Sequence, residues 1–109
     1  MSAPVSTIRN LGPATEAAFA RAGIDSAGAL RAIGADAAYT RLIRSGTRPH
    51  FIGYYALVLG LQGRPWNDCR GREKDGLRVR FDALVTAARQ QDRPESRLAA
   101  ELDRIGVRI

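Results

Sequence analysis

The sequence is short of the residues that metal sites and most catalytic sites use. Among its 109 residues it has one cysteine, Cys69, one histidine, His50, and one lysine, Lys74. A single cysteine cannot form an internal disulfide, and one cysteine with one histidine does not make a zinc ligand set. We therefore expect no metal and no other cofactor.

Motifs of enzymatic chemistry are also missing. The sequence has no glycine-rich phosphate loop ending in lysine, no H-E-x-x-H motif and no recognisable pair of carboxylates. His50 and Cys69 could be a base and a nucleophile, but no neighbouring residue would orient the imidazole or lower the pKa of the thiol. We expect no catalytic residue, and we expect that the chain is not an enzyme.

Long apolar runs are absent as well. Arginine or glycine interrupts every run before the roughly 18 residues that a membrane span needs, and the first ten residues, MSAPVSTIRN, hold no apolar signal core. We expect a cytoplasmic protein with no membrane contact. Hydrophobic residues make up 45% of the chain and charged residues 26%, which is typical of a globular protein. The length fits one domain over residues 1–109.

Positive charge is abundant. Seventeen basic residues against eleven acidic ones give a net charge of +6, and every basic residue except Lys74 is arginine. A bias toward arginine commonly reflects genomic base composition, so the net charge is the informative quantity. A basic surplus attracts phosphate polymers. Charge alone leaves direct DNA binding open.

Apolar periodicity, caps and glycines predict a series of short helices. The expected ranges are 13–22, 27–33, 35–44, a central helix between Pro49 and Gln62, 72–89, and a last helix over about 94–105 that begins with the capping box Asp92–Glu95. No segment alternates with period two, so we expect no sheet. The predicted fold class is all-α, with five or six helices around one core.

The central helix is predicted to be buried because it is apolar on almost every side. Each buried Leu, Ile or Phe contributes about 1.5 to 3 kcal/mol, so this segment is expected to dominate the stability of the domain. The tyrosines Tyr39, Tyr54 and Tyr55 could stack on nucleobases, but their helical spacing favours core packing.

Several motifs resemble those of one family. They are N-L-G-P at 10–13, A-G-I at 22–24, L-R-x-x-G-A at 30–35, Y-A-L at 55–57 and G-x-x-W-N-D at 63–68. Together they resemble the C-terminal domain of the TfoX/Sxy regulators of DNA-uptake competence over about residues 6–84. Cys69 stands where leucine is common in that family, and the last helix has no counterpart.

The resemblance implies a fold similar to helix-hairpin-helix and SAM-like domains. It also implies a non-enzymatic role in regulating transcription of DNA-uptake genes through protein contacts. We find no counterpart of the family's N-terminal domain in this sequence. The expected protein partners are therefore the transcription machinery or a separate protein like that N-terminal domain. The sequence does not indicate an oligomeric state.

The turn from Ile8 to Pro13 is the sharpest candidate for a DNA contact. Its shape resembles the hairpin of helix-hairpin-helix proteins, with Asn10 in a position that requires a left-handed backbone. Arg9 and the backbone N–H groups near Gly12 could bind a phosphate independently of DNA sequence. The alternative is that Gly12 and Pro13 only begin a helix, since too few residues precede Ile8 for the first helix of a hairpin.

Two further surfaces are candidates. The first is a basic patch that could follow a phosphate backbone, made of Arg64, Arg70, Arg72, Lys74, Arg78 and Arg80. Its alternative is an exposed helix face with weak pairs such as Arg78 with Asp82. The second is Trp66 with Asn67, which could contact a partner. The favoured interpretation of that pair is structural, with Trp66 as an apolar plug at the end of the core and Asn67 bonded to nearby backbone.

Overall fold

The helix boundaries follow the prolines, caps and glycines of the chain. A computed structural model describes residues 3–91, and its α-helices are α1 (Pro13–Arg21), α2 (Ala27–Ile33), α3 (Ala35–Arg44), α4 (Phe51–Leu61) and α5 (Gly71–Gln91). Two 3₁₀ turns, η1 (Val5–Thr7) and η2 (Trp66–Asp68), precede α1 and α5. Residues 3–91 contain no strand, so the all-α prediction is confirmed. The helix predicted over 94–105 and its capping box lie outside the described residues.

Local chemistry explains where the helices begin and end. Pro13 occupies the first position of α1, where its missing N–H would have no helical partner. The Ser26 side chain caps α2 by accepting a hydrogen bond of 3.0 Å from the backbone N–H of Ala29. Gly34 has φ 86°, so one residue ends α2 and begins α3. This left-handed residue allows the sharp change of direction between the two helices.

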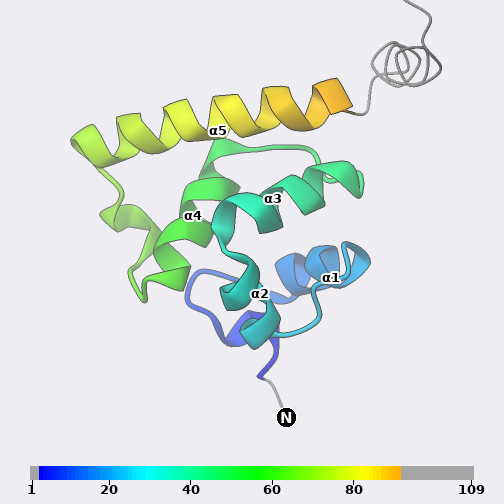
Figure 1. Cartoon of the computed structure of the whole chain (residues 1–109). Coiled ribbons are helices and arrows are strands. Elements are labelled where there is room, and N and C mark those ends of the chain that lie inside the picture. Colours follow the sequence, from blue (N-terminus) through cyan, green and yellow to red (C-terminus); the bar gives the residue numbers. More distant parts are fainter. Residues whose placement is uncertain (1–2, 92–109) are drawn as a thin grey trace, which may run out of the picture.

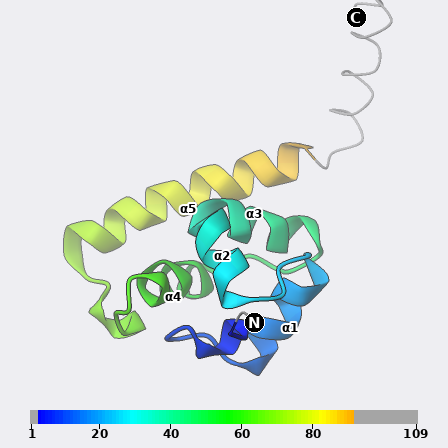
Figure 2. The same ribbon diagram turned by 60° about the horizontal axis from the view of Figure 1, so that its bottom comes forward.

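The helices are arranged with α5 on one side and the N-terminal elements on the other. Figures 1 and 2 show α5 lying across α3 and α4, with α1 and the N-terminal turn η1 on the opposite side. α4 packs against α3, α5 and η2, and α3 also packs against α1 and α2. No helix within residues 3–91 combines the length and the apolar character that a bilayer crossing requires.

One hydrophobic core joins η1 and the five α-helices. Its largest fully buried side chains are Tyr54, Phe19, Ile8, Ile24, Leu30, Leu57, Leu59 and Val5. The predicted core packing of the three tyrosines is confirmed, since Tyr39, Tyr54 and Tyr55 are all buried. Tyr54 lies edge-on to Tyr39 with ring centroids 5.5 Å apart, and Phe81 of α5 packs against both rings. Val5 comes from the 3₁₀ turn η1, which the sequence did not predict.

The central helix α4 is buried along most of its length, but its first turn is not. Tyr54, Tyr55 and residues 57–60 are buried, as the apolar pattern predicts. Ile52, in contrast, is 62% exposed, so the prediction of burial on every side was wrong there. Phe51 packs on Phe81 of α5, and this neighbour covers one side of the first turn and leaves Ile52 in solvent. The apolar pattern of a helix cannot show how far its neighbours extend.

Asp36, near the start of α3, links three helices. Its carboxylate accepts a hydrogen bond of 2.6 Å from the Tyr54 hydroxyl of α4 and one of 2.8 Å from Nη2 of Arg80 in α5. Burial raises the pKa of Tyr54, and the hydrogen bond to Asp36 raises it further. No local pattern in the sequence indicates this link, because its partners lie 18 and 44 residues away.

Candidate functional site

The turn at Asn10 has the predicted left-handed backbone, with φ 72°. The Asn10 side chain is bonded within the fold. Its Nδ2 donates to the carbonyl oxygens of Ala56 at 3.1 Å and Arg64 at 2.9 Å, and its Oδ1 accepts from the backbone N–H of Trp66 at 3.1 Å. Asn10 therefore links the first loop, residues 8–12, to α4 and to the turn that carries Trp66.

The rest of this turn begins a helix. Gly12 is the N-cap of α1, and Pro13 is its first residue. Only a single 3₁₀ turn, Val5–Thr7, precedes the turn among the described residues. Arg9 is exposed and Gly12 is half-buried. The Asn10 side chain is occupied by bonds within the fold. Arg9 and Gly12 are therefore the residues of the predicted phosphate contact that still reach the surface.

A close approach between backbones holds the same loop against α4. A Cβ atom on Gly60 would overlap the carbonyl oxygen of Arg9 and would lie 3.3 Å from its carbonyl carbon. Glycine at position 60 therefore allows the first loop to lie directly on the helix. The sequence signal for this close approach was the glycine at position 60 inside a largely apolar helix.

The turn that carries Trp66 presents its indole to solvent. Trp66 is 51% exposed, so the prediction that it plugs the end of the core was wrong. The bond from its backbone N–H to Asn10 fixes the turn, and Cys69 is the residue of this segment that enters the core. Asn67 accepts a hydrogen bond of 3.3 Å from Nε of Arg70 through its backbone carbonyl. The result is a large apolar side chain held outward on a fixed turn.

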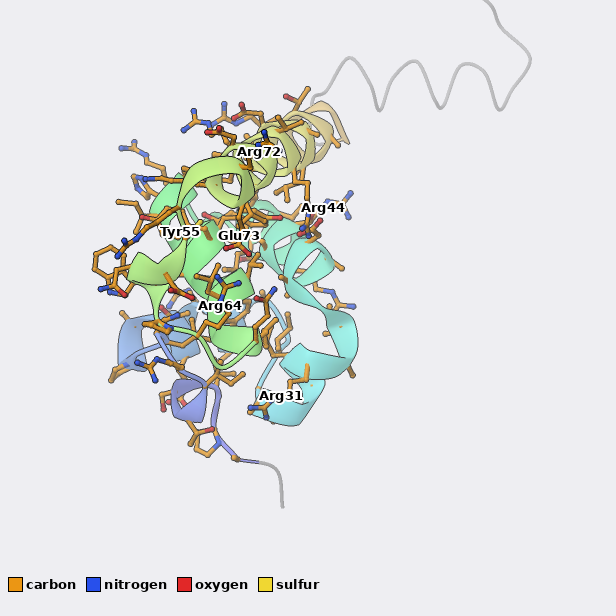
Figure 3. The ribbon with its side chains drawn as sticks, turned by 90° about the vertical axis from the view of Figure 1, so that its left-hand side faces the viewer. Arg31, Arg44, Tyr55, Arg64, Arg72 and Glu73 are labelled. Carbon is orange, nitrogen blue, oxygen red and sulfur yellow. The ribbon has the colours of Figure 1, made fainter. Side chains whose placement is uncertain are left out.

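Arg64 connects this turn to the start of α5 by hydrogen bonds. It donates to both carboxylate oxygens of Glu73, at 2.7 and 2.8 Å, and to Asp68 at 2.9 Å. The hydrogen bonds from Arg64 lower the pKa of Glu73. Figure 3 shows Arg64 and Glu73 near each other, whereas Arg72 lies on the outer side of α5. Two carboxylates thus offset the charge of Arg64.

The predicted basic patch is only partly free of acidic partners. Arg78 pairs with Asp82 at 3.2 Å, as in the alternative of an exposed helix face, and Arg80 pairs with Asp36. Within residues 3–91, the exposed Arg70, Arg72 and Lys74 have no ion pair. The structure therefore leaves three cations of the patch available, with Lys74 also lying over the Tyr55 ring at 5.6 Å.

The net positive charge of the chain comes from residues 1–91. Residues 92–109 contain four basic and four acidic residues, so residues 1–91 account for the net charge of +6. Beyond the predicted patch, Arg41, Arg44 and Arg48 are exposed on α3 and the loop after it. Figure 3 shows Arg44 on a part of the surface away from Arg64. Positive charge is thus spread over several faces.

A groove that the sequence did not predict lies between α1, the α3–α4 loop and α4. Its volume is about 260 Å³, and most of its surface is apolar. The lining residues are Asn10, Leu11, Ala14, Thr15, Ala18, Phe19, Tyr39, Leu42, Thr47, Arg48, His50, Gly53, Ala56 and Leu57. Asn10, which fixes the Trp66 turn, also forms part of this groove.

Comparison with known proteins gives one family. The family model described as the TfoX C-terminal domain matches residues 1–81, which include the Asn10 turn, α4, the Trp66 turn and the first half of α5. No curated protein and no solved structure matches the chain. The resemblance seen in the sequence motifs is therefore confirmed.

Proposed function

Because the chain belongs to the TfoX C-terminal domain family, we propose that it is a non-enzymatic regulatory module of DNA-uptake competence that acts by binding another protein. The partner is a component of the transcription machinery or a separate protein that resembles the family's N-terminal domain. The module contributes a binding surface and no reaction. The family match supports this proposal, and the geometry of the Trp66 turn supports its mechanism.

The observation that most favours a protein contact is the exposed tryptophan. Trp is enriched among the residues that dominate binding energy at protein interfaces. Trp66 is 51% exposed, and its turn is held by Asn10 on one side and by Arg64 on the other. A turn whose backbone is already fixed loses little conformational freedom on binding. The Trp66 turn is therefore the centre of the proposed contact.

The state of Cys69 supports a module without catalysis. Cys69 is 5% exposed, and burial raises the pKa of its thiol. A thiol with a raised pKa is largely protonated at neutral pH and is a poor nucleophile. The other candidate, His50, precedes α4 as its N-cap, and its backbone N–H is bonded to the Tyr39 hydroxyl.

The proposal is tested by quantitative capture of partners from a lysate of the source cells. Tagged wild-type chain is compared with Trp66→Ala and with Val79→Ala, a control at a side chain that is 70% exposed. A hot-spot residue contributes at least about 2 kcal/mol, so Trp66→Ala should weaken recovery of the partner by about thirtyfold. Val79→Ala should leave recovery unchanged. Equal recovery by all three proteins would exclude Trp66 as the contact.

Sequence-independent DNA binding is a second candidate, favoured by the net charge of +6 and by the exposed Arg70, Arg72 and Lys74. Contacts to phosphate give an affinity that falls steeply with salt. Titration of labelled duplex DNA at low and moderate salt tests this function. Weaker binding by Arg72→Ala together with a shallower salt slope supports it, and absence of binding at low salt rejects it.

A further inference from the structure

Two glycines interrupt the apolar helix α4, and only one of them is explained by packing. Gly60 is required because the Arg9 carbonyl lies against it. At Gly53 an added Cβ would meet the Tyr39 hydroxyl oxygen at 3.6 Å and the Tyr39 Cε1 at 4.0 Å, which is ordinary van der Waals contact. Glycine inside a helix is less favourable than alanine by about 1 kcal/mol. Packing therefore does not require glycine at position 53, and this residue contributes only backbone to the lining of the groove.

The groove has the dimensions of a side-chain pocket. Its volume of about 260 Å³ is below the roughly 300 to 1,000 Å³ of typical small-molecule sites. Five buried side chains from three helices and one loop contribute to its lining, namely Leu11, Phe19, Tyr39, Leu42 and Leu57. Apolar grooves of this kind accept the apolar face of an amphipathic helix. The space suits a large apolar side chain presented by such a helix.

The wall formed by the α3–α4 loop is fixed by hydrogen bonds. The Tyr39 hydroxyl donates to the His50 carbonyl at 3.0 Å and accepts from the His50 backbone N–H at 2.9 Å. The backbone N–H of Thr47 donates to the Leu42 carbonyl at 2.9 Å. These bonds hold the loop in place, so the groove is formed without a ligand and binding requires little rearrangement.

The electrostatics of the groove favour an acidic ligand. None of its lining residues is acidic, and Arg48 stands exposed at the edge formed by the loop. Glu16, the acidic residue of α1, is not part of the lining, and its carboxylate accepts a hydrogen bond of 3.0 Å from the Ser6 hydroxyl. Complementary charge across an interface steers association and disfavours partners of like charge.

We infer that this groove is a second docking site, which binds an amphipathic helix of a protein partner by taking one large apolar side chain flanked by acidic residues. The inference goes beyond the proposed function because it concerns a surface other than the Trp66 turn. Gly53 keeps the groove open, the buried leucines bind the apolar side chain, and Arg48 attracts the acidic residues beside it.

The test uses phage-displayed amphipathic peptides and the full chain. One library places glutamate beside the apolar face of each peptide, and the other places lysine there. Binders are expected from the glutamate library, and they should lose at least about tenfold in affinity for Gly53→Leu, whose new side chain fills the groove. Gly76→Leu is the matched control, since an added Cβ at Gly76, on α5, meets nothing within 4 Å. It should bind as the wild type does.

Three further measurements complete the test. Ala14→Glu places a negative charge among the lining residues and should weaken binding of the acidic peptides if Gly53→Leu fails to fold. Methyl signals of Leu11, Leu42 and Leu57 should shift on peptide binding in the nuclear magnetic resonance spectrum. Trp66→Ala should leave peptide affinity unchanged, which separates this inference from the proposed function.

Several results would overturn the inference. These are the absence of binders from the glutamate library, equal enrichment from the lysine library, or peptides that bind Gly53→Leu as tightly as wild type. Nuclear Overhauser contacts between residues 92–109 and Leu57 in the free chain would also overturn it, because the groove would then bind the chain's own end.

Discussion

At the scale of single residues, Asn10 and Gly60 determine where the first loop lies. Asn10 supplies three hydrogen bonds to residues 46 to 56 positions away, and Gly60 allows the Arg9 carbonyl to lie against α4. The left-handed backbone of Asn10 could be predicted, because it follows from residue type and the turn that contains it. Its partners could not be predicted, because hydrogen bonds between distant segments leave no local pattern in the sequence.

Gly60→Ala is expected to destabilise the domain by about 1 to 3 kcal/mol, because the added methyl group must displace the Arg9 backbone. Urea unfolding measures the change. Gly76→Ala is the control, since its position on α5 has open space, and it should stabilise the helix by up to about 1 kcal/mol. Equal stability of Gly60→Ala and the wild type would contradict the close approach.

Asp36→Ala should cost about 1 to 3 kcal/mol, because it leaves the buried Tyr54 hydroxyl without its hydrogen-bond partner. Asp82→Ala is the matched control. Its exposed pair with Arg78 contributes only about 0.3 to 0.5 kcal/mol. Thermal unfolding of the two variants should therefore differ clearly, and similar melting temperatures would argue against the role of Asp36 as a link between helices.

At the scale of elements, the sequence predicted the helices well and their exposure less well. The boundaries of α1, α2 and α3 agree closely with the predictions because Pro13, Ser26 and Gly34 act on their own neighbours in the chain. The exposure of Ile52 and Trp66 was predicted wrongly. Burial depends on which elements cover a residue, and apolar character alone does not determine that.

Leu57→Ala should destabilise the domain by about 2 to 5 kcal/mol, since Leu57 is 1% exposed in the middle of α4. Ile52→Ala, in the exposed first turn of the same helix, should change stability by less than about 0.5 kcal/mol. The urea midpoints of the two variants check this contrast. A mild effect of Leu57→Ala would mean that α4 is not the centre of the core.

The packing of α3 on α4 also predicts a loss of stability in alkali. Burial raises the pKa of Tyr39 and Tyr54 above the ordinary value near 10. The folded state therefore holds these protons more tightly, and the stabilisation is complete below pH 10. As the pH rises above 10, the unfolded state loses its protons first and the free energy of unfolding falls. Urea midpoints measured across this range should decrease, and less steeply for Tyr54→Phe.

At the scale of the whole molecule, composition predicted the class of protein and the motifs predicted the family. The net charge of +6 was also visible in the sequence, but its division between paired and exposed arginines was not. Arg64, Arg78 and Arg80 are paired with carboxylates, two of which, Asp36 and Glu73, lie on other elements than their arginines. The groove was not predicted either, because it is formed jointly by α1, α3, α4 and the loops that precede α1 and α4.

The proposed regulatory role is tested most directly by the level of DNA-uptake transcripts in source cells that carry Trp66→Ala in place of the wild-type chain, at matched protein levels. A regulator that acts through the exposed indole should lose most of its effect on these transcripts, while Val79→Ala, the exposed control, should keep it. Transcript levels in Trp66→Ala cells equal to those in wild-type cells would contradict regulation through the Trp66 turn.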